Sequence, residues 1–202
     1  FVSRDHLGIK PLYFFSNGKF IYIGSEISPL KYFIDLQVDK ESLSEILFFR
    51  YASGKSTGYK NIFKIPAGYN YSINIKTLHV KRRQYFDLVG TFYKKKRIDL
   101  DLIESRLLQS INKHTQSDVG FSIQLSGGLD SSLLVSSLYK MSGRKFDTFS
   151  LSIDEPDFNE YEYRKIVNEL YPTNHHEIFF DSYKFADSFE KTIESLESPT
   201  TH

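Results

Sequence analysis

This sequence contains no cysteine and no tryptophan, and it has one methionine among its 202 residues. Without cysteine, this stretch can supply no disulfide, no thiolate nucleophile and no thiolate metal ligand. It also lacks a signal-peptide pattern and any apolar run near the roughly 18 residues that a membrane-spanning helix needs. Neither sign of charge is in excess, since 26 basic and 25 acidic residues leave a formal net charge of +1. A net charge this close to zero does not indicate a nucleic-acid or membrane partner bound by overall electrostatic attraction.

The remaining composition is that of an ordinary globular protein. Hydrophobic residues make up 40% and charged residues 25% of the chain, and the length suits one large domain or two small ones. The lack of cysteine leaves the compartment open but fits a cytoplasmic enzyme, which is the localisation we expect. The chain begins at Phe1 rather than methionine and ends at His202 without a closing element. We therefore expect a fragment of a longer protein.

Residues 121–139 carry the strongest chemical signal, F-S-I-Q-L-S-G-G-L-D-S-S-L-L-V-S-S-L-Y. The apolar run Phe121–Leu125 predicts a short buried strand, and Ser126-Gly127-Gly128 predicts a turn that lets a ligand approach the backbone closely. A helix is expected to begin near Asp130-Ser131-Ser132. Free N–H groups and the positive end of the helix dipole make such a strand–turn–helix a site for anions.

The order of residues in this turn decides which kind of anion site is expected. Asp130 would repel a phosphate unless a cation lay between them, which predicts a magnesium–polyphosphate site. A Walker loop is excluded because no lysine follows Gly128. The alternative is a serine-capped helix after a glycine turn, since Ser and Asp are common N-caps. Generic capping requires neither the paired glycines nor the two serines after the aspartate.

The motif S-G-G-L-D-S-S resembles the pyrophosphate loop of the N-type ATP pyrophosphatases, which cleave ATP to AMP and pyrophosphate while adenylating a carboxylate. The resemblance implies that ATP and Mg²⁺ are the cofactors. It implies pyrophosphate binding by Ser126, Gly127, Gly128, Ser131 and Ser132. Asp130 would be catalytic and would help to hold the metal, and backbone groups of Leu125 and Leu151 would hold the adenine.

Strands and helices are expected to alternate after this motif. The pattern predicts strands at 147–153 and 176–180 and helices at 159–170 and 182–196, and hence a parallel sheet with right-handed crossovers. The glycine turn would then lie at the carboxyl end of the first strand, where open α/β sheets bind ligands. The adjacent His175 and His176 suggest a metal site at first sight, but neighbours on a strand face opposite sides and cannot readily ligate one ion together.

The N-terminal stretch contains a hairpin signal, with aromatic-rich runs at 12–15 and 20–23 joined across Asn17-Gly18. The segment R-D-H-L-G-I-K-P-L-Y, with this hairpin and G-S-E-I-S-P-L after it, resembles the end of the glutaminase domain of glutamine-hydrolysing asparagine synthetases. That family also places the two motifs in this order. The resemblance implies residues 1–38 as the end of the glutaminase domain, 39–96 as a connecting region and 97–202 as the first half of the synthetase domain.

The fold expected from the resemblance is α/β, with the β-rich tail of an N-terminal nucleophile glutaminase before a parallel-sheet ATP pyrophosphatase (PP-loop) domain. The implied activity is glutamine-hydrolysing synthesis of asparagine from aspartate and ATP through β-aspartyl-AMP. Glu197, in E-S-P, would line the intermediate's site. The implied partners are aspartate, glutamine and ATP, with a homodimer left open. The family's glutaminase nucleophile is an N-terminal cysteine, which this stretch does not contain.

Two alternatives to asparagine synthesis stay open at this point. Relatives with the same domain layout amidate other carboxylates, so a carboxylate other than that of aspartate is an alternative acceptor. A catalytically inactive nucleotide-binding homologue would also carry these motifs, although the intact Asp130 argues against it.

Overall fold

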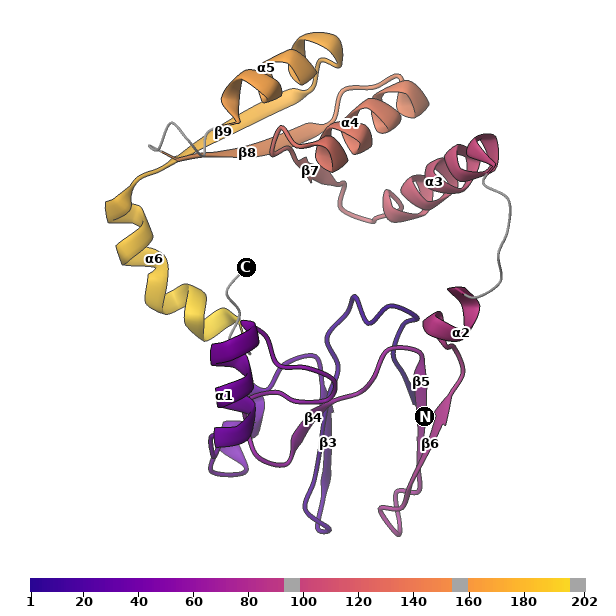
Figure 1. Ribbon diagram of the computed structural model, residues 1–202, viewed down its shortest axis with the longest axis vertical. Coiled ribbons are helices and arrows are strands. Elements are labelled where there is room, and N and C mark those ends of the chain that lie inside the picture. The colour runs from indigo at the N-terminus through magenta and orange to yellow at the C-terminus, as the bar shows by residue number, and fades with distance from the viewer. Residues whose placement is uncertain (93–98, 154–159, 197–202) are drawn as a thin grey trace. The chain divides into compact units, whose positions relative to one another are not determined.

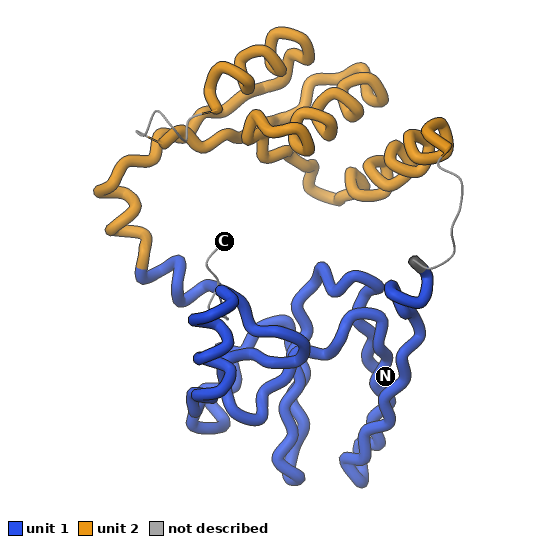
Figure 2. The backbone as a smooth tube through the Cα atoms, in the orientation of Figure 1, with its two compact units in different colours: residues 1–96, 190–202 blue, residues 97–189 orange. Residues whose placement is uncertain are grey.

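The structure is a computed structural model that describes residues 1–92, 99–153 and 160–196 (Figure 1). The chain divides into two compact units, residues 1–96 with 190–202 and residues 97–189 (Figure 2). Each unit has hydrophobic clusters of its own. No helix within the described ranges is long and apolar enough to cross a membrane. The predicted site residue Glu197 lies outside the described residues.

The first unit contains two three-stranded antiparallel sheets, with the orders β1-β5-β6 and β3-β2-β4. Their strands are β1 (Val2–Ser3), β2 (Tyr13–Ser16), β3 (Ile21–Gly24), β4 (Ile62–Lys64), β5 (Tyr69–Ile73) and β6 (Val80–Gln84). The β2–β3 hairpin turns at Asn17-Gly18 as the sequence predicts, with Ser16 opposite Ile21. The short strands β1 and β4 were not predicted, because two or three residues are too few to show a period.

Three short helical segments accompany these sheets: η1 (Ser28–Tyr32), α1 (Lys40–Phe49) and α2 (Leu88–Phe92). Helix α1 buries only Ser42 and Ile46, while Leu47 and Phe49 are exposed. The buried stripe of α1 is therefore narrower than its apolar residues suggest.

The R-D-H-L-G segment forms a closed turn between β1 and β2. The Arg4 guanidinium donates to the carbonyl oxygens of Gly8 at 2.8 Å and Ile65 at 2.5 Å. The Asp5 carboxylate accepts backbone N–H groups of the turn, and these hydrogen bonds, first that of Ile9, lower its pKa. Both charged side chains thus satisfy backbone groups that the turn would otherwise leave unpaired.

The second unit contains the predicted parallel sheet, in the order β7-β8-β9. Its elements are α3 (Leu100–His114), β7 (Ser122–Gln124), α4 (Leu129–Ser142), β8 (Asp147–Ile153), α5 (Tyr161–Leu170) and β9 (Asn174–Phe180). Helix α6 (Ser182–Ser195) follows and spans the boundary between the two units. Helices α4 and α5 pack against each other over one face of the sheet, as two successive right-handed crossovers require (Figure 1).

The hydrophobic core of this unit lies between the sheet and its helices. Its buried members are Ile111, Leu125, Val135, Leu138 and Phe146. Strand β8 departs from this apolar pattern, because its buried side chains are the polar Thr148, Ser150 and Ser152. A buried polar face requires hydrogen-bond partners, and these come from α5, from β9 with the preceding Thr173, and from the Leu125 carbonyl after β7.

Candidate phosphate-binding site

A tight loop joins the carboxyl end of β7 to the N-terminus of α4. Leu125 is fully buried, and Gly128 is the N-cap of the helix, with φ −69° and ψ 168°. The Ser126 hydroxyl accepts the Gly128 N–H at 3.1 Å, while the Ser131 and Ser132 hydroxyls donate to the Gly128 carbonyl at 3.2 and 2.7 Å. The serines of the motif therefore hold the loop against its own helix.

This geometry differs from the alternative of a serine- or aspartate-capped helix. The N-cap is a glycine without a capping side chain, and Asp130 lies one residue inside the helix, in its first turn. The predicted pyrophosphate ligands of residues 126–132 do lie together on one loop and one helix turn, where backbone N–H groups point out of the helix end. Their role as ligands stays a prediction.

Gly127 is the position at which the loop requires glycine. Its φ is +100°, a conformation that L residues with a side chain rarely adopt. A Cβ added there would lie 2.9 Å from the Glu160 carbonyl oxygen and 3.2 Å from Cγ of Arg164. Gly127 therefore lets the loop pass directly against the start of α5.

The Asp130 side chain is exposed at the open end of α4. It forms no hydrogen bond or ion pair with any described residue, so its carboxylate is available to a cation. No cluster of three or more metal-binding side chains occurs in the described ranges. A single carboxylate beside an anion site fits Mg²⁺, because this ion takes one or two carboxylates and completes its shell with substrate phosphates and water.

The two predicted adenine-binding positions differ in how free their backbones are. The Leu125 N–H already donates to the Phe149 carbonyl at 2.8 Å, and its carbonyl accepts the Ser150 hydroxyl. Leu151 lies in the part of β8 that continues past the last pair between β7 and β8, Gln124 with Phe149. An adenine contact at Leu125 would have to use the second lone pair of its carbonyl oxygen. Leu151, in contrast, has no β7 residue paired beside it.

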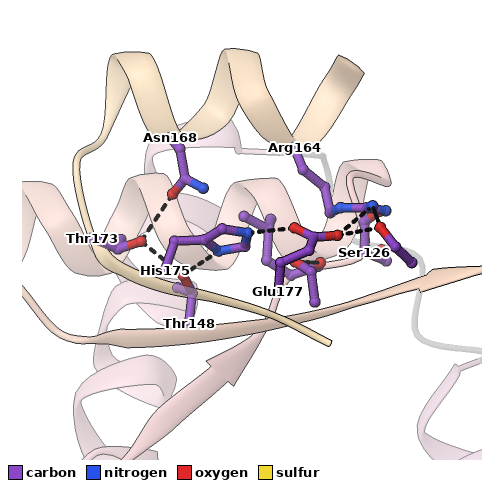
Figure 3. A network of polar contacts seen from close by, with 10 residues as sticks. Ser126, Thr148, Arg164, Asn168, Thr173, His175 and Glu177 are labelled. Atoms are coloured by element: carbon purple, nitrogen blue, oxygen red, sulfur yellow. Dashed lines mark hydrogen bonds and ion pairs between the residues drawn. The ribbon is translucent and has the colours of Figure 1, made fainter. Parts of the chain in front are cut away.

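Behind the loop lies a polar network that the sequence did not reveal (Figure 3). Arg164 of α5 is 3% exposed, and its Nη1 donates to the Ser126 carbonyl at 3.3 Å. Its Nη2 lies 2.8 Å from both the Ser152 hydroxyl and Oε1 of Glu177. Three elements, α5, β8 and β9, thus meet at one guanidinium beside the glycine loop.

The network continues away from the loop through Glu177. Oε2 of Glu177 lies 2.8 Å from Nε2 of His175, and Nδ1 of that ring lies 3.0 Å from the Thr148 hydroxyl. Thr148 in turn lies 2.7 Å from the hydroxyl of Thr173, which donates to the Asn168 side chain at 2.9 Å. The chain of contacts therefore begins and ends on α5, at Arg164 and at Asn168 one helical turn later.

Charge and hydrogen bonds set the ionisation of Glu177. Burial raises its pKa, but hydrogen bonds from Ser152 and His175 and the charge of Arg164 outweigh burial, and the pKa is lowered from 4.5. Glu177 is therefore the counter-ion of the buried guanidinium.

His175 and His176 face opposite sides of β9, as the sequence predicts. His176 stacks on Phe149 at 4.7 Å between ring centroids, away from the network, and lies 3.6 Å from Asp147. The two rings therefore do not converge on one ion.

The only sequence signal for the network was the alternation of Thr and Ser with apolar residues along 148–152, which also fits an exposed strand face.

The lowered pKa of Glu177 predicts an acid-dependent loss of stability. A carboxyl with a lowered folded pKa contributes stability above its unfolded pKa, near 4.5, and loses that contribution as the pH falls through the folded value. We expect Glu177→Gln to destabilise the protein by about 3 kcal/mol at pH 7, because the buried Arg164 loses its counter-ion. The difference from wild type should shrink below about pH 4.5.

Thermal unfolding at pH 7 and pH 4 measures this effect. Glu169→Gln, the same substitution at an exposed position on α5, is the matched control and should shift the midpoint little at either pH. A destabilisation by Glu177→Gln that is equally large at both pH values would contradict the assignment.

Comparison with known proteins agrees with the two motifs. The asparagine synthase family matches residues 102–202, which is half of the chain, and the glutamine amidotransferase domain family matches residues 1–86. The chain is 27% identical over 198 residues, 95% of its length, to a Methanocaldococcus jannaschii protein provisionally named glutamine-hydrolysing asparagine synthetase 2. It is 30% identical over 167 residues to glutamine-hydrolysing asparagine synthetase 1 of Bacillus subtilis, a match that covers 81% of the chain.

A third relative is glutamine-hydrolysing asparagine synthetase B of Escherichia coli, 26% identical over 214 residues and 98% of the chain. The chain spans 38%, 26% and 33% of the lengths of these three relatives. An asparagine synthase match over the strand–loop–helix unit, with a glutamine amidotransferase match before it, reproduces the order of the two sequence motifs. This chain belongs to the asparagine synthetase family.

Proposed function

We propose that the full-length protein carrying this chain is a glutamine-dependent asparagine synthetase. ATP adenylates the side-chain carboxylate of aspartate, which gives β-aspartyl-AMP and pyrophosphate. Glutamine is hydrolysed with water to glutamate and ammonia, and the ammonia displaces AMP to give asparagine. The observation that carries this proposal is the S-G-G-L-D-S-S loop at the end of a parallel strand, with Asp130 exposed at the helix N-terminus that follows.

The loop is suited to a departing pyrophosphate. Gly127 and Gly128 allow close approach of the ligand, and the first turn of α4 presents N–H groups together with the positive end of its dipole. Such donors are fixed before the reaction and stabilise charge as it develops on the leaving group. The hydroxyls of Ser131 and Ser132, which now donate to the Gly128 carbonyl, would add further hydrogen-bond donors on rotation.

Asp130 would hold Mg²⁺ beside the bound phosphates. The ion supplies charge neutralisation of the polyphosphate when bound. The carboxylate's part is to fix one ligand position at the open end of the helix, since it is exposed and otherwise unoccupied among the described residues. Adenine would pair with backbone groups near Leu151, and Glu197 would face the aspartyl intermediate.

The glutaminase step belongs to the amidotransferase part of the protein. The match of residues 1–86 to the glutamine amidotransferase domain family supports this assignment. Because this chain contains no cysteine, the proposed cysteine nucleophile must come from outside it. The described part of the first unit would then support the glutaminase fold without performing the hydrolysis.

The nucleotide product decides between this proposal and kinase-like chemistry. Full-length protein with ATP, Mg²⁺, aspartate and an ammonia source is expected to form AMP and pyrophosphate in step with asparagine. The loop has no lysine for a terminal phosphate, so attack at the α-phosphorus is expected rather than at the γ-phosphorus.

Three other outcomes of that assay are informative. ADP and orthophosphate would overturn the proposal. AMP and pyrophosphate that form only when another carboxylate replaces aspartate would keep the chemistry and change the acceptor. Nucleotide binding without any turnover would identify an inactive homologue.

A further inference from the structure

We infer that Arg164 is a positioning residue for the glycine loop. It fixes the peptide between Ser126 and Gly127 so that the Gly127 N–H faces the bound pyrophosphate. This inference rests on the proposed function and adds a residue to it. Arg164 lies 38 residues from Ser126 in sequence and on a different element. Figure 3 shows its side chain reaching from α5 toward Ser126.

The argument begins with the geometry of one peptide group. In a planar trans peptide, the C=O of Ser126 and the N–H of Gly127 point in opposite directions. The Ser126 carbonyl accepts Nη1 of Arg164, so it points toward α5. The Gly127 N–H therefore points away from α5, and it donates to no acceptor among the described residues. Such an outward N–H is what an anion at the helix N-terminus requires.

Glycine permits this conformation but does not enforce it. Gly127 has φ +100°, and a residue without Cβ adopts negative φ about as readily. A flip of the 126–127 peptide would turn the N–H inward and direct a carbonyl oxygen at the phosphate. A hydrogen bond from outside the loop to the Ser126 carbonyl opposes this flip, and Arg164 donates that hydrogen bond.

The guanidinium is itself held in place on its other side. Its Nη2 lies 2.8 Å from Ser152 of β8 and 2.8 Å from Glu177 of β9, and the Ser152 hydroxyl also donates to that carboxylate. The planar guanidinium of arginine can donate to the loop from one nitrogen and to the sheet from the other, whereas the ammonium group of lysine has a single nitrogen. Burial of Arg164 to 3% exposure further limits its side-chain freedom.

Inhibition of the full-length enzyme by inorganic pyrophosphate tests the role of Arg164. We expect Arg164→Met to raise the inhibition constant for pyrophosphate and the KM for ATP about tenfold or more, because the loop loses the bond that selects one peptide orientation. The KM for glutamine in a glutaminase assay should stay unchanged. Arg164→Lys should rescue only part of the loss and leave the inhibition constant about threefold raised.

Two matched variants separate positioning from charge and from stability. Lys165→Met removes the same charge from the next, exposed residue of α5 and should leave pyrophosphate inhibition as in wild type. Thr173→Val breaks the far end of the network, at Asn168 and Thr148, without touching Ser126. It should lower the unfolding temperature but not weaken pyrophosphate inhibition.

The outcomes distinguish the inference from the proposed function. If wild type makes AMP and pyrophosphate while Arg164→Met is inhibited as strongly as Lys165→Met, Arg164 does not position the loop. If Thr173→Val weakens inhibition as much as Arg164→Met, the effect is general destabilisation and the inference is overturned. If wild type makes ADP and orthophosphate, the proposed function fails and the inference with it. Should Arg164→Met not fold, Arg164→Lys against Lys165→Met gives the same decision.

Discussion

Asp130→Asn is expected to lower ATP-dependent asparagine formation by about 100-fold or more, while glutamine hydrolysis continues. The carboxylate is exposed in the first turn of α4 and forms no bond with a described residue, so the fold does not depend on it. Asparagine keeps the size of the side chain but removes the charge that would hold Mg²⁺ beside the phosphates. The effect should therefore appear in synthesis and in the Mg²⁺ dependence of ATP binding, not in folding.

Asp101→Asn is the matched control for this change. Asp101 is an exposed aspartate in the first turn of α3, so its replacement removes the same charge from an equivalent helix position. It should leave synthesis unchanged. Near-normal synthesis by Asp130→Asn would mean that the aspartate contributes only to the start of its helix. Equal losses of glutaminase and synthetase activity would point to a folding defect instead.

Gly127→Ala is expected to weaken pyrophosphate inhibition about 30-fold and to lower synthesis at least as much. A φ of +100° strains any residue with a side chain by about 1–3 kcal/mol. The new Cβ would also lie 2.9 Å from the Glu160 carbonyl oxygen, which is backbone and cannot rotate away. Relief requires the loop to move from the start of α5, and this movement would break the contact between Arg164 and Ser126.

Gly143→Ala separates this effect from backbone strain alone. Gly143 is the C-cap of α4 with φ +58°, and a Cβ there meets nothing within 4 Å. It should cost stability, about 1 kcal/mol, at the far end of the same helix without changing pyrophosphate inhibition. If pyrophosphate inhibits Gly127→Ala as strongly as it inhibits wild type, pyrophosphate binding does not depend on the close packing of this loop.

The elements of the second unit could largely be predicted from the sequence because local signals agree there. The strand at 147–153 has the predicted bounds, and Asp99 caps α3 by accepting the Leu102 N–H. In the first unit Asn17-Gly18 fixed the hairpin. Strands β1 and β4 could not be predicted, because each exists only through pairing with a distant partner, such as Val2 with Tyr71.

The sequence by itself determined the strand–glycine turn–helix unit and its exposed Asp130, because the residues that build it are consecutive. Only the tertiary structure decided what lies behind that loop. The alternation along β8 marks a strand without saying that Thr148, Ser150 and Ser152 form its buried face. These polar side chains can be buried because each has a hydrogen-bond partner on another segment: Ser152 has Arg164 and Glu177, Ser150 has the Leu125 carbonyl, and Thr148 has Thr173 and His175. No local pattern in the sequence brings these segments together.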